Sequence, residues 1–170
     1  KKFFMETLSF SDIQDQLNHL DVSSLPKIEI AILRNITIEP IEPYIKFFAY
    51  RIGFNANVTF GQFDTIFQEA VENRGKLLNN ETDYVLIFTK LETLSPDLSR
   101  HYSSLSSAEI SEETSRIKEY IGHVITGPRR QTNAFILWHG FEQLVQPSFG
   151  ILDAQNVLGQ QTAIRQLNDF

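Results

Sequence analysis

Short apolar runs alternate with segments of helical periodicity along this chain. The runs that predict strands lie at residues 27–33 (KIEIAIL), 57–60, 84–89 (YVLIFT) and 134–138. The first run is apolar except for Glu29, which is typical of a strand that is covered on both faces. The second run is short and is expected to end at Gly61.

The segments between these runs predict helices. Residues 9–20 place apolar side chains at helical spacing, with Ser9 or Ser11 as the N-cap. A first crossover helix follows Glu39 and stops at Gly53. The remaining helices are expected at residues 64–73, from Ser111 to a stop at Gly127-Pro128, and at 155–167. The Ser-rich residues 91–110 predict a long loop or frayed insertion, and 139–153 a second loop.

Alternation of strands and helices predicts one α/β fold. We expect a three-layer sandwich with a short, mainly parallel sheet, flavodoxin-like or SGNH-hydrolase-like, right-handed crossovers and a central first strand. Residues 1–26 form an N-terminal helix and connection, and 27–170 form the α/β domain. The final helix has no capping residue other than Asn168, so we expect a fragment of a longer protein.

Composition narrows the chemistry. The chain has no cysteine, which excludes disulfides, thiolate metal sites and thioester-forming nucleophiles in these 170 residues. A net charge of −6 with scattered cations argues against nucleic acid, because only Arg129-Arg130 and Lys1-Lys2 are paired. No signal peptide or membrane span is expected, so the cytoplasm is the expected location. A group of phenylalanines is expected in the core of helix and sheet: Phe47, Phe48, Phe54, Phe60, Phe63 and Phe67.

Common catalytic motifs are missing. The sequence holds no GxGxxG, GxxxxGK[ST], GxSxG or HExxH pattern. Its four histidines, His19, His101, His123 and His139, fall in different predicted elements, so neither a metal nor a cofactor is expected.

The carboxyl ends of parallel strands are where such folds bind ligands. Residues at these ends form the candidate crevice: Asn35, Thr37, Gly61, Gln62, Thr89, Glu92, His139 and Glu142. His139 and Glu142 fit a base and its orienter, although a loop histidine is more commonly a surface residue. Glu92 is a site carboxylate or a solvated loop residue. Asn35 either holds a carbonyl or amide of a ligand or caps the turn into the helix at Glu39.

Three stretches resemble the N-terminal domain of FkbH-like proteins. They are IAILRNITIEPIEPYIKFFAYRIGFNANVTFGQF, DYVLIFTKLETL, and FILWHGFEQ with the later GILDAQ and AIRQLNDF. The resemblance implies a downstream catalytic domain of the haloacid dehalogenase superfamily, subfamily IIIC, and a protein that supplies glyceryl units to an acyl carrier protein in polyketide-type pathways. The carrier protein and that catalytic domain are then the expected partners.

The same stretches are similar in plan to SGNH hydrolases. That plan implies a nucleophilic serine where Asn35 stands, and an amide cannot act as one. It implies an oxyanion glycine at Gly61, and an Asn donor near 89–92 that is absent. The leading hypothesis is therefore a noncatalytic domain that positions an acyl substrate or its carrier. The alternatives are an ester hydrolase or acyltransferase that uses Thr37 with His139, and a protein-interaction module.

Overall fold

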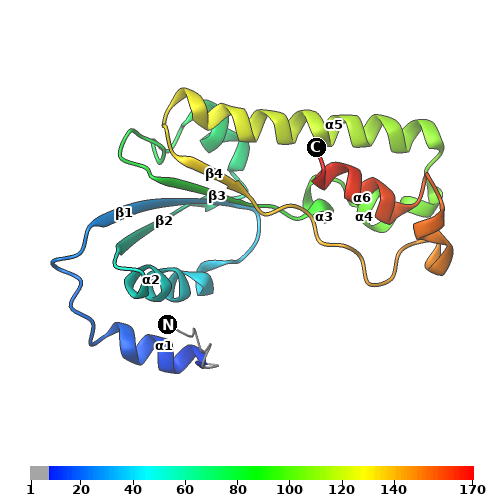
Figure 1. The fold of residues 1–170 in the computed structure, drawn as a ribbon. Coiled ribbons are helices and arrows are strands. Elements are labelled where there is room, and N and C mark those ends of the chain that lie inside the picture. The colour runs from blue at the N-terminus through cyan, green and yellow to red at the C-terminus, as the bar shows by residue number, and fades with distance from the viewer. Residues whose placement is uncertain (1–7) are drawn as a thin grey trace.

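Four parallel strands form the centre of the computed structural model, which describes residues 8–170. They are β1 (Lys27–Arg34), β2 (Asn55–Phe63), β3 (Tyr84–Phe88) and β4 (Phe135–Trp138). Their order in the sheet is β2-β1-β3-β4 (Figure 1). Every pair is parallel, and β1 lies between β2 and β3. The predicted parallel sheet with a central first strand is confirmed.

Helices cover both faces of this sheet. The 3-10 turn η1 (Glu39–Ile41) leads into α2 (Glu42–Arg51), which packs against β2, and α1 (Phe10–Leu17) lies outside α2. The opposite face is covered by the π-helical turn η2 (Gln68–Glu72) and by α5 (Ser107–Thr126) (Figure 1). The three-layer α/β sandwich predicted from the sequence is therefore confirmed.

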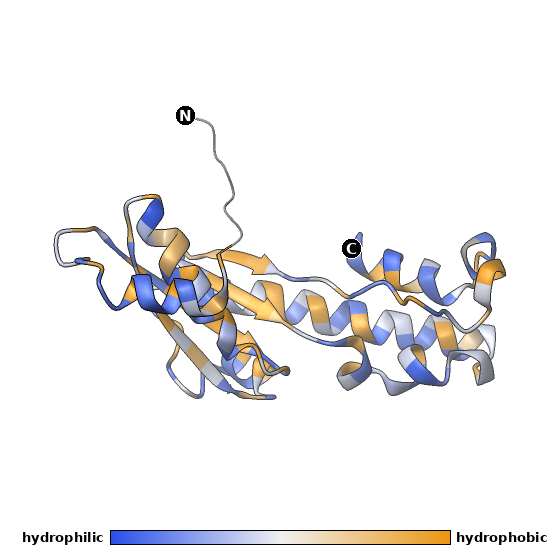
Figure 2. Cartoon of the chain, turned by 90° about the horizontal axis from the view of Figure 1, so that it is seen from below, coloured by the Kyte–Doolittle hydropathy of each residue, from blue (hydrophilic) through white to orange (hydrophobic). Residues whose placement is uncertain are grey.

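The apolar side chains of β1 contribute to two hydrophobic cores, one on each face of the sheet. Ile30 and Ile32 pack toward α2, while Ala31 and Leu33 pack toward η2 and α5. All four are buried. Successive side chains of a strand point to opposite faces, so a strand with a helix layer on each side is apolar throughout. Figure 2 accordingly shows the strands mostly in orange.

Residues 91–110 are not a loop, and that prediction is wrong. They form α3 (Leu91–Leu94), α4 (Pro96–Arg100), η3 (Tyr102–Ser104) and the first turn of α5, which begins at Ser107 and not at Ser111. The serines that suggested a loop act as helix caps: Ser95 accepts a hydrogen bond from Leu98 N, and Ser106 forms a capping box with Glu109. Four apolar residues of this segment are buried: Leu91, Leu98, Tyr102 and Ile110.

These short helices belong to a second lobe. They pack beside the N-terminal half of α5 together with α6 (Gln160–Asn168), whereas the C-terminal half of α5 lies over the sheet (Figure 1). Two fully buried polar residues hold this lobe together. The Asp153 carboxylate accepts hydrogen bonds from the backbone N–H groups of Gln160 and Gln161, and the Gln160 side chain donates to Leu98 O and Ser99 O.

Several predicted boundaries need correction. Strand β2 extends to Phe63, so Gly61 lies inside it, because its pairing with β1 continues past the apolar run. The helix expected at 64–73 is mainly the short η2, which ends at Glu72 and is followed by Asn73 in a left-handed conformation with φ 50°. The last helix begins at Gln160, because residues 150–155 form the separate 3-10 turn η5 (Gly150–Gln155). The stop at Gly127 is followed by another turn, η4 (Gly127–Arg130).

Three of the six phenylalanines expected in the core are exposed, namely Phe48, Phe54 and Phe63. Phe63 lies at the end of the edge strand β2, where the Arg34 guanidinium is 5.7 Å from its ring centre. Phe48 lies on α2 facing a part of the sheet that no helix covers, as described below. Phe47 is buried as expected.

Candidate functional site

A cavity of about 290 Å³ lies at the carboxyl ends of β3 and β4. Four of the predicted crevice residues line it, namely Thr89, Glu92, His139 and Glu142. The structure thus brings together residues that are up to 53 positions apart, from Thr89 to Glu142. Its volume is near the lower end of the range for small-molecule sites, about 300–1,000 Å³.

The other predicted residues lie elsewhere. Gly61 is buried within β2, where a Cβ would lie 3.3 Å from Leu33, and Gln62 is exposed. Strands β2 and β4 are three spacings apart in the sheet, about 14 Å, which separates Gly61 from His139. Thr37 is exposed and is not among the residues that line the cavity with His139.

Asn35 is buried beside the cavity and links β1 to the segment after β3. Its Oδ1 accepts a hydrogen bond from Lys90 N at 2.9 Å, and its own N–H donates to Phe88 O. The side chain therefore contacts the turn after β3 and not the turn at Glu39, where the structure shows no side-chain cap. Because Oδ1 accepts, the Nδ2 group must be the free donor of this amide.

Two buried polar atoms here have no hydrogen-bond partner within residues 8–170. One is Asn35 Nδ2 and the other is Thr89 Oγ1. A buried donor without a partner costs about 1–3 kcal/mol, so such atoms are rare unless a water molecule or ligand completes them. Asn35 directly follows β1 and Thr89 directly follows β3, and these two strands are neighbours in the sheet. Thr89 lines the cavity, and Asn35 lies beside it through its bond to the lining residue Lys90.

The charged side chains around the cavity are mostly exposed. Arg100 forms an ion pair with Glu92 at 3.3 Å, and Lys90 and Glu142 are further charged lining residues. Neither Lys90 nor Arg100 was among the predicted site residues. Arg100 lies in residues 91–110, which were expected to be a loop. The apolar lining was also missed, since it comes from four separate segments: Ile36, Leu91, Leu144 and Ile164.

The cavity shows no nucleophile paired with a base. Its lining hydroxyls are Thr89 and Ser99, and Ser99 Oγ donates to Pro96 O. The His139 Nδ1 lies 3.1 Å from Gly140 O, and its ring packs on Phe88 with 5.1 Å between ring centres. Within the described residues His139 bonds neither to Glu142 nor to a hydroxyl. A base activates a serine or threonine through such a bond, and the described lining residues do not form one in this structure.

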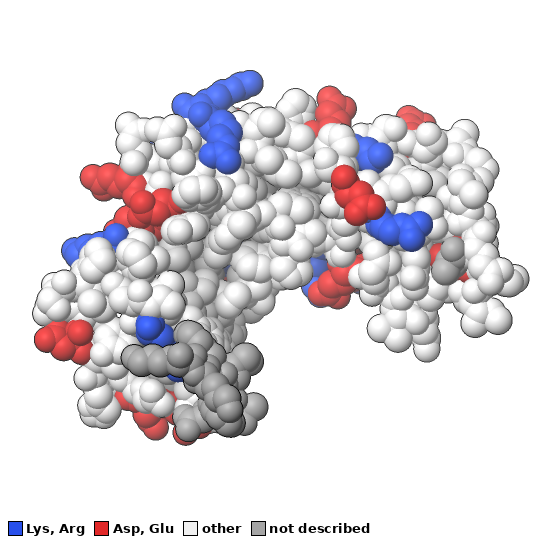
Figure 3. Space-filling model, viewed as in Figure 1, with Lys and Arg blue, Asp and Glu red and all other residues white. Residues whose placement is uncertain are grey.

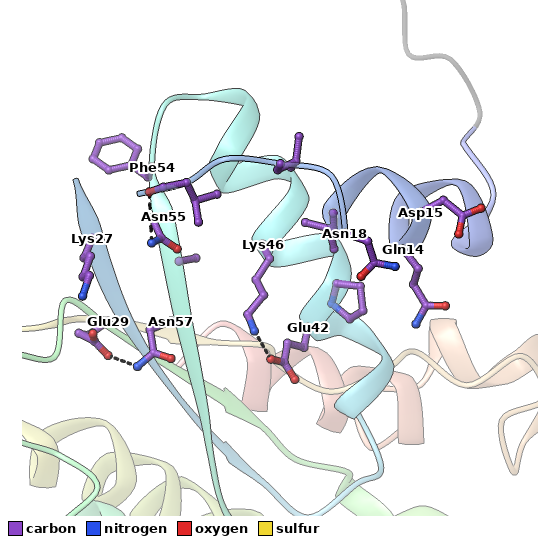
Figure 4. A pocket seen from close by; sticks show the side chains of 15 residues that line it. Gln14, Asp15, Asn18, Lys27, Glu29, Glu42, Lys46, Phe54, Asn55 and Asn57 are labelled. Carbon is purple, nitrogen blue, oxygen red and sulfur yellow. Dashed lines mark hydrogen bonds and ion pairs between the residues drawn. The ribbon is translucent and has the colours of Figure 1, made fainter. Parts of the chain in front are cut away.

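A larger cavity, about 880 Å³, opens at the other end of the strands, between α1, α2 and β2 (Figure 4). Four of its polar side chains bond to one another in pairs: Lys46 pairs with Glu42, and Asn57 donates to Glu29 at 2.6 Å. Ligands of open parallel sheets bind at the carboxyl ends, and this cavity lies at the amino ends. We therefore regard the smaller cavity as the candidate site.

Neither a metal centre nor a membrane span is found in the part of the chain that the structure describes. Residues 8–170 contain no cluster of three or more His, Asp or Glu side chains that could hold a metal ion. Among the same residues, every helix is too short or too polar to cross a bilayer.

Comparisons with known proteins support the fold. No protein-family model matches the sequence, and no match is found among curated proteins. One solved structure is similar: the N-terminal part of the protein BF1531 from Bacteroides fragilis, containing a phosphatase domain and complexed with Mg. The TM-score is 0.70 at 14% identity, over 95% of this chain and 41% of that one. The chain therefore spans less than half of the solved chain and shares its fold over nearly all of its own length.

Proposed function

We propose that this chain is a noncatalytic SGNH-like domain of an FkbH-like protein, which positions an acyl unit or its acyl carrier protein for a downstream haloacid-dehalogenase-type domain. The observation that carries the proposal is a pair of buried polar atoms without hydrogen-bond partners at the carboxyl ends of the strands: Thr89 Oγ1 in the cavity lining and Asn35 Nδ2 beside it. An amide donor there suits the carbonyl oxygen of an acyl or pantetheine group.

Two further observations support this proposal. The cavity pairs no hydroxyl with a base, so a bound ester or thioester would be held without being attacked. The Lys90 ammonium group suits the phosphodiester of a phosphopantetheine arm, whereas the charge of Arg100 is already paired with Glu92. The similar structure from Bacteroides fragilis contains a phosphatase domain, which is consistent with a place beside a phosphoryl-transfer domain.

An NMR titration tests the proposal. A phosphopantetheinylated acyl carrier protein is added to the ¹⁵N-labelled chain, with the unmodified carrier as the control. Amides of Asn35, Thr89 and Lys90 should shift first, and only with the modified carrier. Gly61 should not respond, because it lies two strands away from β3. Shifts confined to β2 would instead favour the interaction-module alternative.

A matched pair of variants tests the role of the amide. Asn35→Asp keeps the oxygen that accepts from Lys90 N but removes the unpartnered donor, while Asn133→Asp makes the same change at an exposed position. We expect Asn35→Asp to weaken binding about tenfold or more, since one hydrogen bond contributes about 1 kcal/mol and its buried partner is left unpaired. Thr89→Val removes the second unpartnered polar atom without adding a charge and should also weaken binding. Equal affinity in all four proteins would contradict the proposal.

A labelling experiment addresses the hydrolase alternative. A fluorophosphonate probe should not label the chain, because no serine or threonine at the cavity is activated. Stoichiometric labelling, or ester turnover that Thr37→Ala abolishes, would establish an active hydrolase or acyltransferase instead.

A further inference from the structure

Part of the sheet is left bare on the side of α2. Phe135 and Leu137 of β4 are 70% and 54% exposed, although they belong to a strand of the central sheet. Helix α2 covers β1 and β2 but does not reach β4. Between them lies a groove of about 400 Å³, whose lining includes Tyr84, Leu86 and Leu137 from the sheet, Phe48 from α2, and Ile52, which follows α2. We call these residues, with Phe135, the bare face.

The outer edge of β4 is also free. Within residues 8–170, β4 pairs with β3 and with no other strand. Phe135 N and His139 N bond to Asp83 O and Ile87 O on the β3 side. Because bonding direction alternates along a parallel strand, the backbone groups of Ile136 and Trp138 point outward.

Edge strands in proteins that stay soluble usually carry charge or proline, which blocks the pairing of further strands. Strand β4 is Phe-Ile-Leu-Trp and has neither. The bare face next to it is likewise uncharged except for Arg51 at its border. Figure 3 shows a hollow between the part of the molecule that holds α1 and α2 and the second lobe, and few charged side chains across the middle of this view.

We infer that the free edge of β4 and the bare face form a docking surface for an uncharged, apolar segment of the downstream part of the same protein. That segment adds a strand beside β4 and covers the bare face. All-parallel sheets are covered on both faces, so the sheet lacks part of one layer. The inference rests on the proposed function.

The net charge of the chain and the length of the similar protein favour a segment of the same protein as the occupant. A second copy of the chain would bring another net charge of −6 to the surface, which opposes association. In the similar solved structure more than half of the chain lies outside the matched region, so a protein of that plan contains the polypeptide needed.

Hydrogen exchange in the longer natural protein tests this inference. The amides of Ile136 and Trp138 should exchange slowly there, because a docked strand bonds to them. Leu137→Lys should speed their exchange at least tenfold while β1 amides stay protected, because it places a charge in the bare face without unfolding the sheet. Val145→Lys is the matched control, since Val145 is exposed and lies outside the bare face.

Two outcomes overturn the inference. Fast exchange of Ile136 and Trp138 in the unmodified longer protein would show that nothing docks on β4. Protection that disappears on dilution, together with a change from dimer to monomer, would identify a second copy as the occupant. Neither result affects the carrier-protein titration, which reports on Asn35 and Lys90. Failure of the docking surface and failure of the proposed function are therefore distinguishable.

Discussion

Burial changes the acidity of two tyrosines. Tyr102 lies inside the second lobe, where its hydroxyl donates to Leu158 O at 3.0 Å, and burial together with the Asp153 charge raises its pKa to about 12. Burial and the charge of Asp64 raise the pKa of Tyr120 to about 12 as well. In both cases the larger cause is removal from water, which disfavours the phenolate.

These pKa values predict a loss of stability in strong alkali. An unfolded tyrosine ionises near pH 10, whereas the folded state keeps both hydroxyls protonated until about pH 12. Their stabilising contribution is thus complete below pH 10 and disappears as the pH rises from 10 to 12. Phenolate absorbance should show two late-ionising tyrosines that vanish in Tyr102→Phe and Tyr120→Phe. Ionisation of all five tyrosines near pH 10 in the native state would contradict this.

Two glycines of the α5 region should respond oppositely to the same substitution. A Cβ at Gly127 would lie 2.5 Å from the backbone oxygen of Ala70, so Gly127→Ala must displace η2. We expect a loss of about 1–3 kcal/mol in the free energy of unfolding. A Cβ at Gly122 meets nothing within 4 Å, and Gly122→Ala should gain up to about 1 kcal/mol from helix propensity. Urea unfolding of both variants measures this, and equal effects would refute the close approach of η2 and α5.

At the scale of elements, β1 is the strand on which both cores depend. Ile32 is fully buried and Ile30 nearly so, both between the sheet and α2. Each change to alanine should lower the free energy of unfolding by about 2–5 kcal/mol, through lost burial and the cavity left behind. Val145→Ala is the exposed control and should stay within about 0.5 kcal/mol. Unchanged urea midpoints for Ile30→Ala and Ile32→Ala would mean that β1 is not core.

Helix caps show which features of an element can be predicted from local sequence. The pattern Ser106-x-x-Glu109 is a capping box, and it marks the start of α5 where the serine content of residues 91–110 suggested a loop. The composition misled because serine favours both loops and caps. Burial of Leu98 and Tyr102 against α5 and α6 decided the matter, and those contacts join segments far apart in sequence.

At the scale of the whole molecule, α5 and Trp138 join the two lobes. Helix α5 contributes Ile117 and Ile121 to one core and Val124 to the other, and Trp138 packs against both. We expect the lobes to unfold together. Trp138 is the single tryptophan, so its fluorescence and far-ultraviolet circular dichroism should give the same urea midpoint. Two separate transitions would show that the lobes are independent.

The sequence by itself determined the type of fold. A continuous apolar run such as that of β1 is typical of a strand covered on both faces, and the alternation of such runs with helical segments predicted a parallel three-layer sandwich with a central first strand. Four residues of the candidate site, among them Thr89 and His139, were also found from sequence, because strand ends can be located from local patterns.

Only the tertiary structure decided which strand ends meet. Gly61 and His139 were both predicted to lie at the carboxyl ends of strands. They do not meet, because β1 and β3 separate β2 from β4. The hydrogen bond from Lys90 N to Asn35 Oδ1 links residues 55 positions apart. Phe135 and Leu137 are exposed because α2 does not extend over β4. Local patterns indicate the period and burial of an element and suggested a central first strand, whereas the positions of β2 and β4 at opposite edges depend on contacts between segments far apart in sequence.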